Sequence, residues 1–291
     1  MPKLIKAKTA LNKITNDYLP YKWDLNIYRG CIHRCHYCYA LYSHKYLESD
    51  QFFDDIYVKT NIAELLEQKL RSSYWQKSII NLGGVTDSYQ PAEADYKIMP
   101  EILKVMIKYR NPITISTKSD LILRDYDLIA ELARYTAVNV ACTIITTDDD
   151  TRKIVEPHAS PIAQRVSVLK AFQKTKVSTG MHTMPILPYI TDQPENFENL
   201  FALAKECEVD YVLTEFLNLR SQTRKHFLSF IQTQFPQFYA DYLKLYKGWL
   251  VDKTYKSKIY TLISSLKAKY RIPKYTDRPV KNFSDQQLGL F

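Results

Sequence analysis

The stretch Tyr28-Arg29-Gly30-Cys31-Ile32-His33-Arg34-Cys35-His36-Tyr37-Cys38-Tyr39 decides how the rest of this 291-residue sequence is interpreted. It places three cysteines at Cys-x3-Cys-x2-Cys spacing, directly after the alternating residues 23–28, which predict a strand that Gly30 ends. Five cysteines are present in all, and random scatter would rarely bring three of them so close together. An odd number argues against a disulfide framework. The cluster therefore needs its own chemical explanation, whereas Cys142 and Cys207 are expected to be ordinary buried residues.

Three thiolates this close in sequence are able to surround one iron–sulfur cluster. They would ligate three irons of a 4Fe–4S cluster and leave the fourth without a protein ligand, much as catalytic metal sites keep one position free. The positive Arg29 and Arg34 would help to keep the thiols ionised. The alternative is a zinc site in which His33 or His36 supplies the fourth ligand. Structural zinc sites usually include a second, distant Cys pair, and this sequence has none.

Outside this stretch, hydrophobic periodicity alternates between strands and helices. Predicted strands cover residues 78–82, 112–117, 137–145, 177–184 and 211–214, and predicted helices cover residues 60–72, 100–109, 124–135, 161–173 and 194–207. About six β/α units in a row predict the α/β class, with a parallel sheet and helices outside it. Because functional candidates follow the strands, we expect a partial (β/α)6 barrel of the TIM type. A flat, doubly wound sheet is the alternative.

The pattern changes after Leu219, where only helices are predicted, over residues 227–246 and 256–271. From Ile272 onward the chain is rich in proline and polar residues, which predicts an extended segment. We therefore expect three parts: a core domain over residues 1–219, a basic helical extension over 220–272 and an extended tail over 273–291. The extension is rich in aromatic side chains, which are able to stack on nucleic-acid bases but at helical spacing more often form a core: Tyr239, Tyr242, Tyr246, Trp249, Tyr255 and Tyr260.

The cysteine spacing resembles that of the radical S-adenosylmethionine (radical SAM) superfamily, and further motifs resemble its spore photoproduct lyase-like branch. The first is Leu82-Gly83-Gly84-Val85-Thr86-Asp87-Ser88-Tyr89-Gln90-Pro91, at the predicted second strand. The others are Ser116-Thr117-Lys118-Ser119 with Arg124-Asp125, Glu156-Pro157, and Arg165. The resemblance runs from Trp23 to Leu219 with the motifs in the same order. It implies an enzyme that cleaves S-adenosylmethionine reductively at a 4Fe–4S cluster to a 5′-deoxyadenosyl radical.

The same resemblance implies roles for individual residues. Tyr37 and Tyr39 match the surroundings of a tyrosine that relays a hydrogen atom. The cofactor-binding candidates are Gly83, Gly84, Thr86, Asp87, Lys118, Thr143, Glu156 and Arg165; Lys118 matches a contact to the cofactor carboxylate, and Glu156 and Arg165 form either an ion pair that organises this end of the site or a surface pair. An electron donor such as flavodoxin or ferredoxin is also implied.

One position departs from the branch. Spore photoproduct lyase has a cysteine three residues before the aspartate of the second-strand motif, and this cysteine returns a hydrogen atom to the repaired base. Gly84 stands at that position here, and neither Cys142 nor Cys207 matches it. We therefore expect a relative with different chemistry rather than photoproduct cleavage by the same route.

The net charge of +9 is concentrated in the last quarter of the chain. Residues 220–291 contain 14 basic and 4 acidic side chains, whereas the other residues contain 26 basic and 27 acidic ones. A basic face attracts polyanions through their phosphates, so DNA or another nucleic acid is the expected substrate, unless the lysines are surface filler. A radical enzyme acting on a protein or small molecule, and a zinc-held nucleic-acid-binding module without catalysis, are the alternatives.

The two ends of the sequence also carry signals. The chain ends in Gln287-Leu288-Gly289-Leu290-Phe291, which resembles the peptide by which bacterial polymerases and repair proteins bind the replication sliding clamp. Leu290 and Phe291 would fill an apolar pocket while Gln287 forms a hydrogen bond at its edge. At the other end no apolar segment follows the basic start, and no long apolar run is present. We therefore expect a cytoplasmic protein with no membrane partner.

Overall fold

The structure is a computed structural model that describes residues 2–16, 19–47, 49 and 51–273. The proposed clamp-binding residues Gln287, Leu288, Leu290 and Phe291, and almost all of the predicted tail, lie outside the described residues. No helix in the described ranges is long and apolar enough to cross a membrane.

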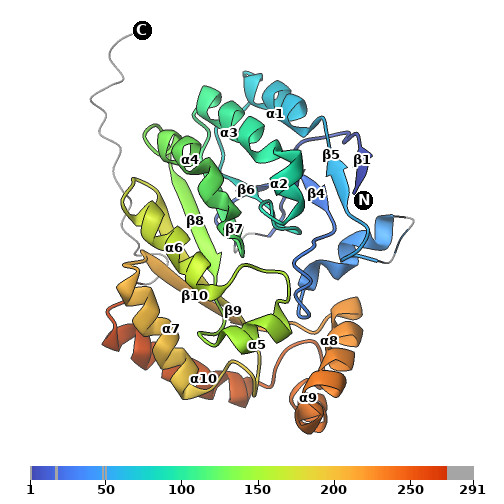
Figure 1. Ribbon diagram of the computed structural model, residues 1–291, viewed down its shortest axis with the longest axis vertical. Coiled ribbons are helices and arrows are strands. Elements are labelled where there is room, and N and C mark those ends of the chain that lie inside the picture. Colours follow the sequence, from blue (N-terminus) through green and yellow to red (C-terminus); the bar gives the residue numbers. More distant parts are fainter. Residues whose placement is uncertain (1, 17–18, 48, 50, 274–291) are drawn as a thin grey trace.

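Six parallel strands form the main sheet, and each pairs with the next one along the chain (Figure 1). They are β3 (Trp23–Leu25), β6 (Ile80–Leu82), β7 (Ile113–Thr117), β8 (Val138–Thr143), β9 (Ser178–Ile186) and β10 (Tyr211–Phe216). The short β2 (Asn12–Lys13) adds an antiparallel edge to β3. A doubly wound sheet reverses its strand order partway, whereas this order never reverses. The predicted partial (β/α)6 barrel is confirmed, and the two end strands of the order, β2 and β10, leave it open.

Helices connect these strands and cover one face of the sheet. They are α1 (Ile62–Arg71), α2 (Ala92–Tyr96), α3 (Ile98–Tyr109), α4 (Tyr126–Leu132), α5 (Asp149–Val155), α6 (Ile162–Gln173) and α7 (Pro194–Glu206). The buried apolar residues of β7 and β8, such as Ile115 and Val140, form one core with helix residues such as Met106 and Phe172. Since side chains alternate along a strand, every second residue points to the opposite, concave face. The functional candidates at the strand ends and on that face are thus held by one continuous core.

The first predicted strand, residues 23–28, is divided between two sheets. β3 ends at Leu25, and β4 (Tyr28–Arg29) belongs to a small sheet with β5 (Tyr57–Lys59) and β1 (Lys3–Ile5). The change occurs at Asn26, whose side-chain Oδ1 accepts a hydrogen bond from Val85 N at 2.9 Å and whose carbonyl accepts one from Lys59 Nζ at 2.6 Å. Alternation of apolar residues does not reveal such a change of partner.

Two predicted helices also differ from the structure. The helix predicted over residues 124–135 starts within the 3₁₀ helix η2 (Asp120–Asp125), and the α-helix α4 follows directly from Tyr126. Residues 227–246 are broken into α8 (Ser221–Gln234), the 3₁₀ turn η3 (Pro236–Phe238) and α9 (Tyr239–Leu245). The break falls at Pro236, because proline has no N–H to donate and its ring collides with the preceding turn.

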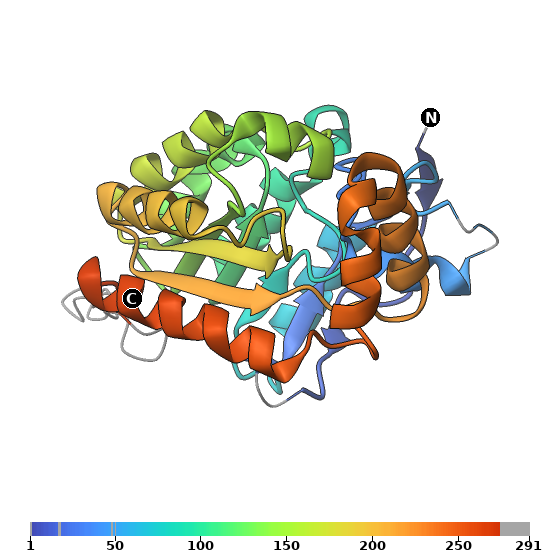
Figure 2. The ribbon, with the colours of Figure 1, turned by 90° about the horizontal axis from the view of Figure 1, so that it is seen from below.

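The C-terminal helices pack against the barrel. α10 (Lys253–Lys269) lies along β10, where Lys267 Nζ donates to Val212 O at 3.1 Å, and it also contacts α7 (Figure 2). Tyr242 and Tyr246 are fully buried, and their hydroxyls donate to Pro188 O and Leu217 O. These two aromatic side chains are core residues and are not available to stack on bases. The division of the chain into three parts stays a prediction.

Candidate active site

The three cysteines lie on the loop between β4 and the 3₁₀ helix η1 (Tyr39–Tyr46), at the carboxyl edge of the sheet. Cys31 and Cys35 are buried, and Cys38 is half-buried. Backbone hydrogen bonds hold the loop: Cys31 N donates to Phe52 O at 3.2 Å and Cys38 N to Cys35 O at 3.0 Å. Gly30 precedes the first cysteine with φ +76°, and a Cβ there would lie 2.6 Å from Asp55 O. Only glycine fits this sharp approach.

Gln90 ties the cysteine loop to the segment after β6. Its Nε2 donates to Gly30 O at 3.0 Å, and its Oε1 accepts from Ile32 N at 2.9 Å. Gln90 is fully buried. Both peptide groups that flank Cys31 are therefore fixed by one side chain, a contact that the motif around Gln90 does not predict.

Asp87 joins three segments of the site. Its carboxylate accepts from Thr117 Oγ1 (2.8 Å), Lys118 N (2.8 Å) and Tyr89 N (2.8 Å). His33 Nε2 lies 3.1 Å from Asp87 Oδ2. Burial alone would raise the pKa of Asp87, but the hydrogen bond from His33 and the backbone donors lower it to about 2. The ionised carboxylate thus links the cysteine loop to the end of β7.

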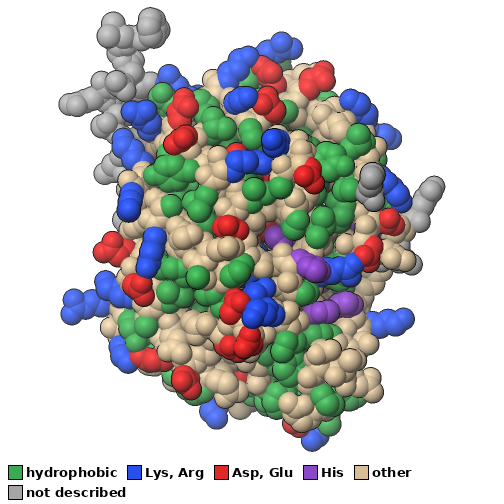
Figure 3. Space-filling model, viewed as in Figure 1, with side chains coloured by type: hydrophobic (Ala, Val, Ile, Leu, Met, Phe, Trp, Pro, Cys, Tyr) green, Lys and Arg blue, Asp and Glu red, His purple; other side chains and the backbone are tan. Residues whose placement is uncertain are grey.

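Both histidines that a zinc site would use are engaged elsewhere. His33 lies between Asp87 and the His158 carbonyl, which is 3.1 Å from His33 Nδ1. His36 stacks on Phe230 of α8, with ring centroids 4.1 Å apart, and its Nδ1 lies 3.3 Å from His226 Nε2. Surface histidines form one group where η1, α5 and α8 meet (Figure 3). These contacts argue against the zinc alternative.

The cation beside the thiols is Lys118 rather than a neighbour in sequence. Burial raises the pKa of Cys31, Cys35 and Cys38 to about 12, and the charge of Lys118 opposes this rise at Cys35 and Cys38. Burial would lower the pKa of Lys118 itself, but Cys35, Glu156 and Asp87 raise it, so it stays charged. Arg34 instead pairs with Asp54 at the surface. Buried thiols become good ligands when a bound metal supplies positive charge, so this donor set fits an iron–sulfur cluster.

Glu156 and Arg165 form a buried ion pair, so a surface pair is excluded. Arg165 Nη1 lies 2.6 Å from Glu156 Oε2, and both side chains are almost completely buried. Arg165 also donates to Ser160 O at 2.7 Å and to Thr143 O at 2.8 Å. The Tyr37 hydroxyl donates to Glu156 Oε1. This network connects the loop after α5, the end of β8 and the cysteine loop.

The two tyrosines beside Cys38 have different surroundings. Tyr37 is buried and its hydroxyl is bound to Glu156, whereas the side chain of Tyr39 is largely exposed and its hydroxyl donates to Gly84 O. Thr86 Oγ1 bonds to Tyr28 O at 3.4 Å, and Thr143 is buried at the end of β8. Of the two candidates for hydrogen relay, Tyr39 is therefore the one that is exposed to solvent, and it contacts Gly84.

Gly83 and Gly84 turn the chain back over β3. Gly83 has φ +94°, and a Cβ on it would lie 2.6 Å from Thr86 O. A Cβ on Gly84 would lie 2.1 Å from Asp24 Oδ2. Asp24 is buried, and its carboxylate accepts from Asn26 Nδ2 and Asn81 Nδ2 at 2.7 Å each. An acidic side chain thus fills the space next to Gly84 where a side chain of residue 84 would lie.

The concave face of the sheet carries a polar row that sequence reasoning missed. Ser116 Oγ lies 3.0 Å from His182 Nδ1, and Tyr211 Oη lies 3.4 Å from His182 Nε2. Asn139 Nδ2 donates to Tyr211 Oη at 2.9 Å. Burial, aided by the charge of Lys118, lowers the pKa of His182 to about 4, so it is neutral at pH 7. The signal in the sequence was at least one polar or aromatic hydroxyl-bearing residue within each of four neighbouring strands, on the face opposite the apolar core positions.

Comparison with known proteins gives the family. The model of the radical SAM superfamily matches residues 25–203. An uncharacterized protein of Mycobacterium tuberculosis is 32% identical over 273 residues, which covers 92% of this chain and 80% of the relative. An uncharacterized protein of Methanocaldococcus jannaschii is 30% identical over 243 residues, covering 81% of this chain and 84% of the relative.

Solved structures agree on the fold. A variant of spore photoproduct lyase superposes with a TM-score of 0.69 at 13% identity, covering 92% of this chain and 79% of that one. A second variant, solved with bound AdoMet and dinucleoside spore photoproduct, has a TM-score of 0.69 at 11% identity and covers 97% and 82%. Identities this low show a common fold alone. The family model, which matches more than half of the chain, establishes that this chain belongs to the radical SAM superfamily, and the solved structures show that its fold is like that of spore photoproduct lyase.

Proposed function

We propose that Cys31, Cys35 and Cys38 hold a 4Fe–4S cluster with one open iron, and that the chain acts on a nucleic acid. Membership of the radical SAM superfamily implies an iron–sulfur cluster and S-adenosylmethionine as cofactors, and an electron donor. When bound, the two cofactors supply one-electron cleavage of the sulfonium to methionine and a 5′-deoxyadenosyl radical, which takes a hydrogen atom from a substrate C–H bond.

The residues of this chain would position and enclose that chemistry. Lys118 is charged, lies over the Tyr37 ring at 5.7 Å and is close to Cys35, which suits it to the carboxylate of the cofactor. Gly83 and Gly84 would bind the cofactor through their backbone groups, because Thr86 O and the Asp24 carboxylate occupy the space that side chains at these two positions would take. Thr86, Asp87, Thr143, Glu156 and Arg165 would act indirectly, because their polar groups or backbone carbonyls are bound to other protein groups.

Tyr39 is the residue we propose for hydrogen transfer to or from the substrate. The side chain is largely exposed, and its hydroxyl lies against Gly84 O. Residue 84 has no side chain to take part, and Asp24 fills the adjacent space. The chemistry after hydrogen abstraction would therefore differ from a route that uses a thiol at this position.

The observation that carries the nucleic-acid proposal is the contact between the basic extension and the cysteine loop. Thr223 Oγ1 on the first turn of α8 donates to Cys38 O at 3.0 Å, and α8 packs along η1. The excess positive charge of the chain begins at Arg220, just before this helix. A polyanion held by the extension would thus lie beside the cluster loop.

Further parts of the proposal concern partners and location. Flavodoxin or ferredoxin would supply the electron, and residues 287–291 would contact a sliding clamp in the cytoplasm. The match of Gln287, Leu288, Leu290 and Phe291 to the clamp-binding pattern supports the second point.

The substrate class is tested by following the abstracted hydrogen. Nucleic acid, protein and small-molecule fractions are prepared from cells grown in deuterated medium, and each is incubated with the reduced holoenzyme and S-adenosylmethionine. We expect deuterium in 5′-deoxyadenosine only with the nucleic-acid fraction. Deuterium transferred only from the protein or small-molecule fraction would contradict the nucleic-acid substrate and favour a radical enzyme on that other class.

A further inference from the structure

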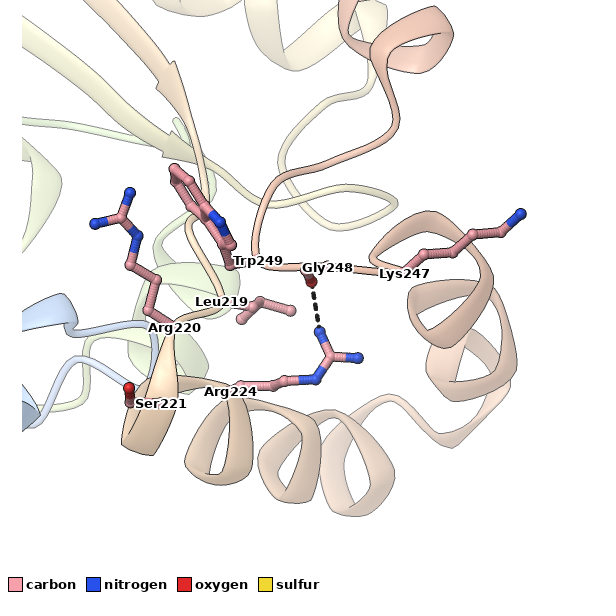
Figure 4. A pocket seen from close by; sticks show the side chains of 7 residues that line it. All are labelled: Leu219, Arg220, Ser221, Arg224, Lys247, Gly248 and Trp249. Atoms are coloured by element: carbon pink, nitrogen blue, oxygen red, sulfur yellow. Dashed lines mark hydrogen bonds between the residues drawn. The ribbon is translucent and has the colours of Figure 1, made fainter.

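A basic cavity opens next to the cysteine loop, between the end of β10, the start of α8 and the segment after α9. It has a volume of about 560 Å³, and its lining combines Arg220, Arg224 and Lys247 with Trp249, Leu219 and Ser221 (Figure 4). No acidic side chain belongs to the lining. Since β10 runs parallel to the strands of the site, this cavity lies at the same carboxyl edge of the sheet.

The two arginines are held in place by uncharged partners. The Arg220 guanidinium lies 3.5 Å from the centre of the Trp249 ring. Arg224 Nη1 donates to Gly248 O at 2.8 Å and its Nη2 to Tyr246 O at 3.0 Å. Leu219 N donates to Trp249 O at 2.9 Å, which fixes the two walls against each other. Among the described residues, no carboxylate forms an ion pair with any of the three cations. Their charge is therefore available to an external anion.

The geometry points to this cavity as the binding site for a backbone phosphate of a nucleic-acid strand, an inference that rests on the proposed function. Fixed guanidinium groups match the oxygens of a phosphate. The cavity begins within one helical turn of Thr223, whose hydroxyl contacts the Cys38 carbonyl. A strand anchored here would run past the open side of the cluster loop, where Tyr39 lies. In Figure 4 Lys247 extends away from Arg220, so it would contact a neighbouring part of the strand.

Two double variants separate this site from general electrostatic attraction. Arg220→Gln with Lys247→Gln removes two charges from the cavity and keeps the bonds that Arg224 makes to backbone carbonyls. Lys174→Gln with Lys205→Gln removes two charges from exposed lysines near the ends of α6 and α7, at the opposite edge of the sheet. The measurement is fluorescence anisotropy of a labelled single-stranded DNA oligonucleotide with the reduced holoenzyme, at several salt concentrations.

We expect the cavity variant to bind the strand about tenfold more weakly or worse, with a smaller salt dependence, and the control variant to stay within about twofold of the wild type. If the two double variants bind alike, the cavity assignment is wrong while the nucleic-acid substrate stands.

If the wild type does not bind the strand at all, the nucleic-acid proposal fails. In that case inorganic pyrophosphate is titrated: a fluorescence change that Trp249→Phe abolishes would assign the cavity to free phosphates and overturn the strand assignment, and the absence of a change would overturn the phosphate site altogether.

Discussion

The carboxylate of Asp24 occupies the space that a side chain on residue 84 would need, since a Cβ on Gly84 would lie 2.1 Å from Asp24 Oδ2 and 2.4 Å from Oδ1. Asn26 and Asn81 each donate a hydrogen bond to the carboxylate, so it is not able to rotate away without losing a buried hydrogen bond. Glycine at position 84 and aspartate at position 24 thus depend on each other. This pair separates the chain from an enzyme that presents a thiol at position 84.

Gly84→Ala is expected to lower the free energy of unfolding by about 1–3 kcal/mol, because the new methyl group collides with a fixed carboxylate. The control is Gly248→Ala, since no atom lies within 4 Å of a Cβ added there; it is expected to change the stability by less than about 0.5 kcal/mol. Denaturant unfolding without oxygen measures both. In a double-mutant cycle with Asp24→Ala, the cost of Gly84→Ala should fall. An equal loss of unfolding free energy in Gly84→Ala and Gly248→Ala would show that the Asp24 carboxylate moves aside easily.

Lys59 donates a hydrogen bond to the carbonyl of Asn26, which in turn holds Asp24. We predict that Lys59 makes the free energy of unfolding depend on pH. Burial lowers the pKa of Lys59 to about 8, from 10.5. Between these two values the unfolded chain binds more protons than the folded chain, so stability rises as pH rises from 8 to 10.5. Relative to Lys59→Met, the wild type should gain up to about 3 kcal/mol across this window. The difference in unfolding free energy between the two proteins, measured at pH 8 and pH 10.5, checks this. A difference that stays constant with pH contradicts a neutralised Lys59.

Removing one partner of the buried ion pair is expected to be costly. Glu156→Gln leaves the Arg165 guanidinium buried without an opposite charge, which should lower the unfolding free energy by about 3–5 kcal/mol. The exposed pair Lys170–Glu206, whose atoms Nζ and Oε1 lie 2.6 Å apart, provides the control; Glu206→Gln should cost no more than about 1 kcal/mol. Adding Arg165→Met to Glu156→Gln should recover part of the loss. Similar unfolding midpoints for Glu156→Gln and Glu206→Gln would show that the buried pair stabilises nothing.

Tyr39→Phe is expected to separate cleavage of the cofactor from conversion of the substrate. Removing the hydroxyl takes away the proposed relay but none of the cluster ligands, so 5′-deoxyadenosine should still form while substrate conversion drops by about tenfold or more. Tyr42→Phe, also largely exposed on η1, is the control and should convert substrate normally. The ratio of 5′-deoxyadenosine to converted substrate is the quantity to measure. Normal coupling in Tyr39→Phe would assign the relay elsewhere.

Local sequence patterns predicted the barrel well, because six strands and their helices each follow a clear period. α6, predicted at 161–173, spans Ile162–Gln173, and α7, predicted at 194–207, spans Pro194–Glu206. The broken helix at Pro236 was predictable from proline chemistry, but the apolar period on both sides concealed it.

Relationships across the fold were harder to predict. Nothing local indicates that Asp24 meets Gly84, that Lys118 rather than Arg34 lies beside the thiols, or that Gln90 holds the cysteine loop. Each depends on which strand ends lie next to one another, and that arrangement is a property of the assembled sheet. The neutral His182 depends likewise on Ser116 and Tyr211 from neighbouring strands.

The most direct measurement is the iron, sulfide and 5′-deoxyadenosine content of protein purified without oxygen, reduced with dithionite and mixed with S-adenosylmethionine. We expect about four irons per chain and release of 5′-deoxyadenosine. Both should be lost in Cys31→Ala, Cys35→Ala and Cys38→Ala but kept in Cys207→Ala, the control for a buried cysteine outside the loop. One zinc per chain without 5′-deoxyadenosine, or full iron and activity in any of the three loop variants, would contradict the cluster site.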